Sequence, residues 1–129
     1  MTPELTALTL AALLQVLHFC IYSVTAQMQV GTGYALSPRD SKRDLTGTAG
    51  RAQRAMNNHF ESLILFAIAA LTITFADKAT HSTGAVAILY LIARALYLPA
   101  YLLGLSPWRS LIWVVGFLAT VYLLIRALL

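Results

Sequence analysis

Charge and cysteine are both scarce in this sequence. Only 11% of its 129 residues are Asp, Glu, Lys or Arg, and 59% are hydrophobic, whereas soluble domains average about 25% charged residues. With a mean hydropathy of +0.73, this scarcity excludes an ordinary soluble domain and predicts a membrane protein. The single cysteine, Cys20, excludes an internal disulfide. Because Cys20 lies in an apolar run, we interpret it as a small buried residue rather than a reactive thiol.

The residue patterns of metal and hydrolytic sites are missing as well. The three histidines, His18, His59 and His81, fall at different levels of the expected helices and lack ligand-like spacing, so we expect no metal site. A Ser-His-Asp arrangement is excluded because Asp77 and His81 are expected on the opposite side of the membrane from Ser110.

Four apolar runs are long enough to cross a hydrocarbon core of about 30 Å. We therefore predict an all-α integral membrane protein whose residues 1–129 form one domain, a bundle of four transmembrane helices. The helices are expected at about residues 4–27, 48–76, 83–103 and 107–128. Thr2 and Ser106 are the expected N-caps of the first and last helices, and each is followed by a proline at the first helical position.

The basic residues indicate the orientation of these helices. The net charge is +4, and the segment 39–54 holds five basic residues against two acids, an excess typical of a cytoplasmic loop. Both this connection and the one between the third and fourth helices are then cytoplasmic, with both termini outside. Clustering of cations in membrane connections also argues against a nucleic-acid partner. Arg126, near the outer end, is expected to extend to the interface.

A polar stripe marks the start of the second helix. At about 100° per residue, Arg51, Arg54, Asn58 and Glu61 project within roughly 80° of one another. A charge at the bilayer centre costs about 2.5 to 3.5 kcal/mol, so such residues face a cavity or a partner. This stripe is therefore the first candidate for a functional site.

The first and third helices carry further polar faces. On the third, Tyr90, Arg94, Tyr97 and Tyr101 share one side. Arg94 needs an acceptor, and Glu61 is expected to supply it, either as a purely structural pair or beside a site. On the first helix, Gln15, His18 and Tyr22 share a side, which we interpret as interhelical hydrogen bonding. The alternative is that they form one wall of a polar site.

Arginines also stand where two helices begin on the same side of the membrane. Helix N-termini carry partial positive charge and favour acids in the first turn. Here Arg51 and Arg54 open the second helix instead, and Arg109 opens the fourth. Guanidinium groups beside free backbone N–H groups attract anions such as carboxylates or a thiolate. We therefore expect an anion site at this end of the bundle.

Three motifs follow one another along the expected helices: Arg51-x-x-Arg54-Ala55-x-x-Asn58-x-x-Glu61, then Arg94-x-x-Tyr97-x-x-x-Tyr101, then Arg109-Ser110. In this combination nearly the whole chain resembles the MAPEG family, the membrane-associated proteins of eicosanoid and glutathione metabolism, and within it the small bacterial members. The resemblance implies a homotrimer of four-helix protomers in the bacterial inner membrane. It also implies glutathione sites between neighbouring subunits near the cytoplasmic face.

The resemblance also implies roles for individual residues. Glutathione, the thiol co-substrate, would be bound by residues of the second and third helices, and its thiolate would be stabilised at the start of the fourth. The implied binding residues are Arg51, Arg54, Asn58, Glu61, Arg94, Tyr97 and Tyr101, and the implied catalytic residues are Arg109 and Ser110. The chain departs from the family's eicosanoid enzymes at Ser62, where many have tyrosine, and at Gly31 and Thr32, where some have arginine.

Two functions are compatible with these motifs. The first is a glutathione-dependent transferase or peroxidase, of the kind used in detoxification, acting on lipophilic electrophiles that enter from the bilayer. The second is a non-catalytic membrane trimer that binds a lipid or a partner protein. Retention of the arginines favours the first. A channel or transporter has little support, because the chain shows no pair of interrupted helices.

Overall fold

The computed structural model describes residues 1–129 and contains helices only. Its elements are α1 (Pro3–Val30), the short α2 (Thr32–Leu36), α3 (Gly47–Phe75), α4 (His81–Leu102) and α5 (Trp108–Leu128). The four long helices are each long and apolar enough to cross a membrane. The predicted all-α bundle of four spanning helices is thereby confirmed. The expected helix bounds agree to within three residues; α1 continues three residues further than expected, and α2 was not expected.

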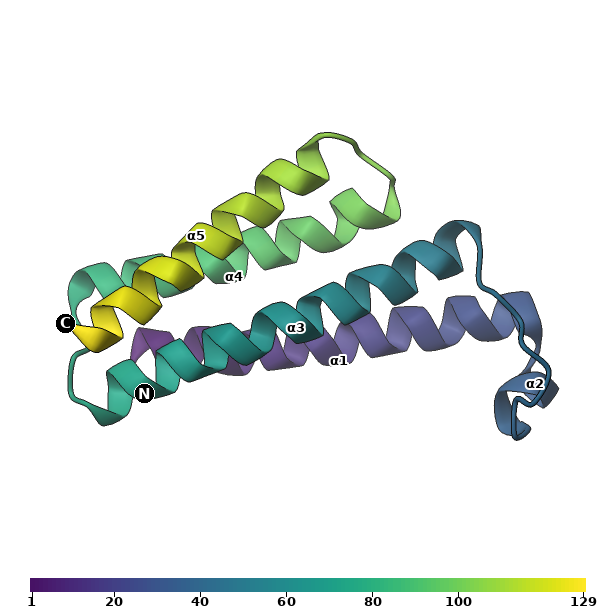
Figure 1. The fold of residues 1–129 in the computed structure, drawn as a ribbon, viewed down its shortest axis with the longest axis horizontal. Coiled ribbons are helices and arrows are strands. Elements are labelled where there is room, and N and C mark those ends of the chain that lie inside the picture. The colour runs from purple at the N-terminus through teal and green to yellow at the C-terminus, as the bar shows by residue number, and fades with distance from the viewer.

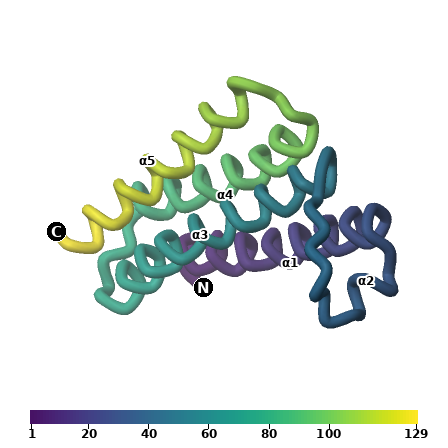
Figure 2. Tube along the Cα trace, turned by 45° about the vertical axis from the view of Figure 1, so that its right-hand side comes forward, coloured from purple at the N-terminus to yellow at the C-terminus, as the bar shows by residue number.

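The long helices form two antiparallel hairpins that pack against each other. In both views α1 lies beside α3, and α4 lies beside α5 (Figure 1, Figure 2). Contacts between α1 and α4 and between α3 and α5 join the hairpins. Both termini and the α3–α4 turn lie at one end, while the 31–46 connection and the α4–α5 turn lie at the other (Figure 1). The α4–α5 hairpin diverges from α3 toward this second end.

Local sequence explains where α1 and α4 begin. The Thr2 hydroxyl accepts a hydrogen bond from the Leu5 N–H at 3.2 Å, as predicted for an N-cap. Thr80 and Thr83 form a reciprocal capping box at α4. The prediction for α5 was wrong: Pro107 is its N-cap, and Ser106 makes no capping bond. In the first turn of α5, the Arg109 N–H instead donates to the Leu105 carbonyl and the Ser110 N–H to the Pro107 carbonyl, each at 3.0 Å.

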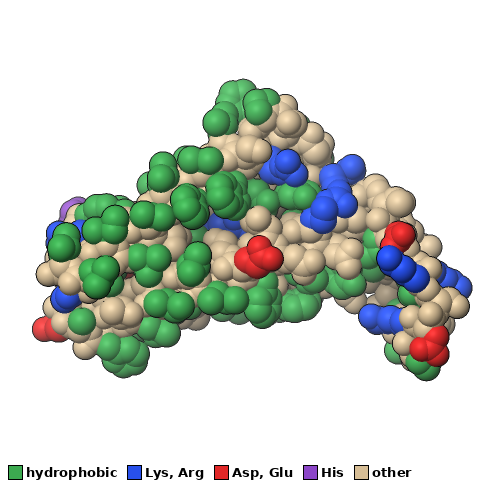
Figure 3. Space-filling model, in the orientation of Figure 1, with side chains coloured by type: hydrophobic (Ala, Val, Ile, Leu, Met, Phe, Trp, Pro, Cys, Tyr) green, Lys and Arg blue, Asp and Glu red, His purple; other side chains and the backbone are tan.

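Alanines form most of the seam between the hairpins. Near the end that holds the termini, seven alanines surround a few larger buried side chains, and the Phe66 and Tyr90 rings stack with their centroids 3.9 Å apart. A smaller cluster of Ala55, Tyr97, Leu98 and Tyr101 lies toward the other end. Small side chains let membrane helices approach closely, so most of the bulky apolar residues face outward over the surface (Figure 3).

Cys20 lies on this outward surface. It is exposed, so the expectation of a buried cysteine was wrong. The helix α1 is apolar on nearly all sides, and composition alone therefore does not distinguish a lipid-facing position from a buried one.

Candidate functional site

A groove runs between α3 and α5, with α4 as its floor. It consists of three adjoining hollows of about 170, 450 and 170 Å³. The first hollow shares Tyr101 and Arg109 with the second, and the second shares Asn58 and Trp113 with the third, so the three form one surface. Basic side chains gather where the end of the α4–α5 hairpin meets α3 (Figure 3). We call this surface the groove.

The groove collects eight of the nine residues predicted from sequence, and the ninth lies directly beneath it. Its lining includes Arg51, Arg54, Asn58, Glu61, Tyr97, Tyr101, Arg109 and Ser110. Arg94 is the residue beneath, only 1% exposed. The helical spacing of the stripes on α3 and α4 brings these side chains together, as their periodicity predicted.

Tyr101 organises the cationic end of the groove. Its hydroxyl accepts a hydrogen bond from Arg54 Nε at 3.1 Å, and the Arg109 guanidinium lies over its ring, 4.6 Å from the centroid. One buried tyrosine thus holds two guanidinium groups from different helices, through a hydrogen bond and a cation–π contact. Arg51 is tied to the end of α4, where its Nε donates to the Leu102 carbonyl at 2.9 Å.

Arg94 has different partners from those expected. Its Nη1 donates to Asn58 Oδ1 and its Nε to His59 Nδ1, both at 3.1 Å, and its guanidinium lies 4.3 Å from the Tyr97 ring centroid. The expected pair with Glu61 was wrong: the only ion pair in the chain joins Lys42 and Asp44. Glu61 is exposed and lines the groove instead, which leaves its carboxylate available to a ligand.

The polar face of α1 neither forms the expected interhelical hydrogen bonds nor lines the groove. Gln15 and His18 are buried but have no hydrogen-bond partner, so the expected interhelical bonds are not formed. His18 stacks on His59, with the ring centroids 4.9 Å apart. Neither residue lines the groove, and neither does Tyr22, so the alternative of a site wall is also wrong for this groove.

Several residues of the site were missed by sequence reasoning. His59 holds Arg94 from below, and Ser62 lies in the groove with its hydroxyl 2.8 Å from the Tyr90 hydroxyl. Further apolar lining comes from Leu65, Trp113 and Phe117. His59 follows Asn58 directly, so it falls outside the i, i+3, i+4 stripe that marked the site. The apolar residues carry no signal in a sequence that is apolar throughout.

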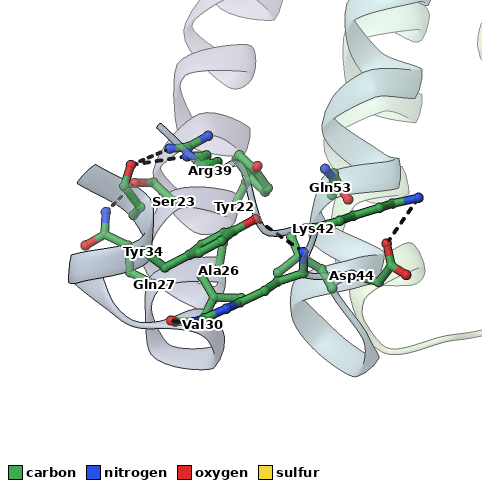
Figure 4. Close-up of a pocket in the computed structure, with 13 residues that line it drawn as sticks. Tyr22, Ser23, Ala26, Gln27, Val30, Tyr34, Arg39, Lys42, Asp44 and Gln53 are labelled. Atoms are coloured by element: carbon green, nitrogen blue, oxygen red, sulfur yellow. Dashed lines mark hydrogen bonds and ion pairs between the residues drawn. The ribbon is translucent and has the colours of Figure 1, made fainter. Parts of the chain in front are cut away.

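A second pocket, of about 400 Å³, lies away from the groove between the end of α1 and the 31–46 connection (Figure 4). Its cations mainly stabilise the connection itself. Arg43 Nη1 donates to the Val30 carbonyl at 2.9 Å, and Arg39 Nη2 donates to the Ala35 carbonyl at 2.8 Å. These carbonyls end two helices, where cations are favoured. The pocket shares no lining residue with the groove.

The groove can hold an amphipathic anion. Three guanidinium groups gather at its cationic end. Its other end is bordered by Leu65, Trp113 and Phe117, and the single carboxylate of the groove, that of Glu61, lies in this same hollow. A small molecule with carboxylates would bind at the first end, and an apolar molecule from the bilayer would contact the second. The middle hollow, with Arg109 and Ser110 in its wall, is where the two would meet.

Comparison with protein-family models matches residues 5–129 to the MAPEG family. A search among curated proteins finds no match. Together with the four apolar helices, the match to a family of membrane bundles identifies the chain as an integral membrane protein.

Proposed function

We propose, on the premise that the chain belongs to the MAPEG family, that it is a glutathione-dependent membrane transferase or peroxidase acting on lipophilic electrophiles. The observation that supports this proposal is the groove itself. It joins a cationic end at Tyr101 to an apolar end at Phe117. A water-soluble thiol and a membrane-soluble substrate need such a pair of neighbouring surfaces.

The lining residues fit the charges of glutathione. Glutathione has two carboxylates, one ammonium group, two amides and a thiol. Arg51 and Arg54 provide forked donors for carboxylates, and Glu61 provides the acid for the ammonium group. Asn58 lies between them, with an amide that suits the peptide bonds. Tyr97 and Tyr101 form the wall below.

Arg109 and Ser110 are the proposed catalytic residues. Glutathione supplies a nucleophilic sulfur, which is mostly protonated at neutral pH like the thiol of a free cysteine. Lowering its pKa by about two units requires roughly 2.7 kcal/mol of preferential thiolate stabilisation. Arg109, half-buried against Tyr101, provides the positive charge, and the Ser110 hydroxyl provides a hydrogen bond. Tyr101 keeps the guanidinium in place during the reaction.

The proposed enzyme is a homotrimer in the bacterial inner membrane. Arg54, Glu61 and Ser110 are exposed on the single protomer, and a neighbouring subunit placed over the groove would enclose a bound tripeptide. The cationic end then faces the cytoplasm, where the positive-inside rule places the 31–46 connection. The exposed apolar residues of the outer surface contact lipid.

Glutathione binding to the purified protein tests this proposal. We expect Arg54→Ala to weaken binding about tenfold, because it removes a charge-assisted contact of roughly 1.4 kcal/mol. Arg109→Ala should mainly raise the pKa of the bound thiol, which the thiolate absorbance reports. Lys42→Ala is the matched control, since it removes an equally charged side chain that is 88% exposed and outside the groove.

The alternative of a non-catalytic membrane protein makes the opposite prediction. Wild type and both groove variants would then show the same unmeasurable binding, while a lipid or partner protein would still copurify with the chain. Wild-type binding that Lys42→Ala weakens as much as Arg54→Ala would also contradict the proposal, because general attraction to a cationic surface would explain it.

A further inference from the structure

A chain of buried contacts connects α1 to the groove, although no α1 residue lines the groove. His59 is completely buried on α3, and its Nε2 lies 2.9 Å from the Ala11 carbonyl of α1. Its Nδ1 accepts the Nε–H of Arg94 at 3.1 Å. Arg94 in turn donates from Nη1 to Asn58 Oδ1, and Asn58 lines two of the three hollows.

These partners permit only one proton arrangement on the His59 ring. A carbonyl only accepts, so Nε2 must carry the proton that faces Ala11. A guanidinium only donates, so Nδ1 must be without one. The ring is therefore the neutral Nε2–H form. Either other form would place an N–H of the ring against an N–H of Arg94.

The orientation of Arg94 depends on this acceptor. The guanidinium has no carboxylate partner, and its Nη2 has no partner at all. Its remaining contacts are Asn58 Oδ1 and the face of Tyr97. Loss of the Nδ1 acceptor would leave a second nitrogen of a buried cation unpaired, which strongly favours a different side-chain position.

Arg94 also determines which group Asn58 presents to the groove. The Asn58 oxygen is bound to Arg94, so its NH₂ group remains as the donor for a ligand. We propose that His59 is a positioning residue: by holding Arg94 it fixes the Asn58 amide with its donor toward the bound molecule, so that the site selects a ligand carbonyl or carboxylate there. This inference rests on the proposed function, because it specifies how the glutathione site is held.

Two substitutions separate this role from simple packing. In His59→Asn, Oδ1 takes the place of Nδ1 as the acceptor for Arg94, but the ring that stacks on His18 is lost. In His59→Phe, the ring and the stack are kept and the acceptor is lost. We expect His59→Phe to raise the Kd and KM for glutathione about tenfold with a smaller change in kcat, and His59→Asn to stay within about threefold of wild type.

A packing role predicts the reverse order, in which His59→Asn binds glutathione more weakly than His59→Phe. That result would overturn the inference. Thermal unfolding in detergent checks that both variants are folded. Wild-type binding that His59→Phe leaves unchanged refutes the positioning role alone, whereas absence of binding in the wild type refutes the proposed function with it.

The ring itself provides a readout that packing would not affect. Nitrogen NMR of histidine-labelled wild-type protein, without glutathione, should show one buried ring with a protonated Nε2 and an unprotonated Nδ1. A His59 ring that carries its proton on Nδ1, or on both nitrogens, would contradict the contact with Arg94 and overturn the proposal.

Discussion

Gly50 and Gly116 allow a test of how closely the helices beside the groove are packed, because the same substitution should destabilise the protein at Gly50 only. Gly50 is buried in the first turns of α3. A Cβ there would lie 2.9 Å from the Leu45 carbonyl oxygen and 3.3 Å from Arg54 Nη1. At Gly116 on α5 the nearest atom would be Arg94 Cδ at 3.6 Å, an ordinary van der Waals distance.

The expected magnitudes follow from two opposing terms. Alanine is favoured over glycine inside a helix by up to about 1 kcal/mol, and this gain applies at both positions. At Gly50 it is offset by an overpacking cost of about 1 to 3 kcal/mol, because the clash is with backbone that no rotamer change relieves. We expect Gly50→Ala to lower the free energy of unfolding by about 1 kcal/mol and Gly116→Ala to leave it unchanged or raise it.

Unfolding in detergent measures the change in the free energy of unfolding. Glutathione binding measures a second effect, the displacement of Arg54. Gly50→Ala pushes against the guanidinium of Arg54, so it should also weaken binding, whereas Gly116→Ala should not. If Gly50→Ala is as stable as Gly116→Ala, the contact between Leu45 and α3 is looser than described. If it is destabilised with unchanged binding, the position of Arg54 does not depend on this contact.

Two further predictions concern single hydroxyl groups. Tyr101→Phe removes the acceptor for Arg54 and keeps the ring under Arg109. At about 1 kcal/mol for such a hydrogen bond, glutathione should bind roughly fivefold more weakly. The double variant Tyr101→Phe with Arg54→Ala should bind glutathione no more weakly than Arg54→Ala alone in the same titration. Thr83→Val removes the hydroxyl that donates to the fully buried Glu4 and caps α4. It should lower the free energy of unfolding by about 1 to 3 kcal/mol, whereas Thr83→Ser, which keeps the hydroxyl, should unfold near the wild-type midpoint.

The sequence predicted the helices and most of the groove because both depend on periodicity. Apolar runs of 20 or so residues have few alternatives in a membrane, and the spacing of Arg51, Arg54, Asn58 and Glu61 fixes a common face whatever packs against it. Arg109 was expected near Arg51 and Arg54 because the second and fourth helices begin on the same side of the membrane. The roles of Arg109 and Ser110 came from the resemblance, since spacing within one helix says nothing about a partner helix.

The partners of individual side chains could not be predicted in the same way. Arg94 and Glu61 were expected to pair because their charges are opposite and their depths similar. The rotation of α4 against α3 instead directs Arg94 toward Asn58 and His59. Such a rotation depends on the packing of the whole seam. The α2 helix was missed for a simpler reason: five residues after a glycine at φ +87° give too short a pattern to recognise.

The alanine seam reverses the usual rule for which positions tolerate substitution. In a water-soluble bundle the large apolar side chains fill the interior, and exchanging them is costly. In this chain Leu13, Phe75 and Met28 face outward and could be exchanged for one another with little effect on helix packing. At Ala11 and Ala70, both completely buried, a single added branch would force the two hairpins apart. Substitutions in this fold are therefore expected to be tolerated least at its smallest buried side chains.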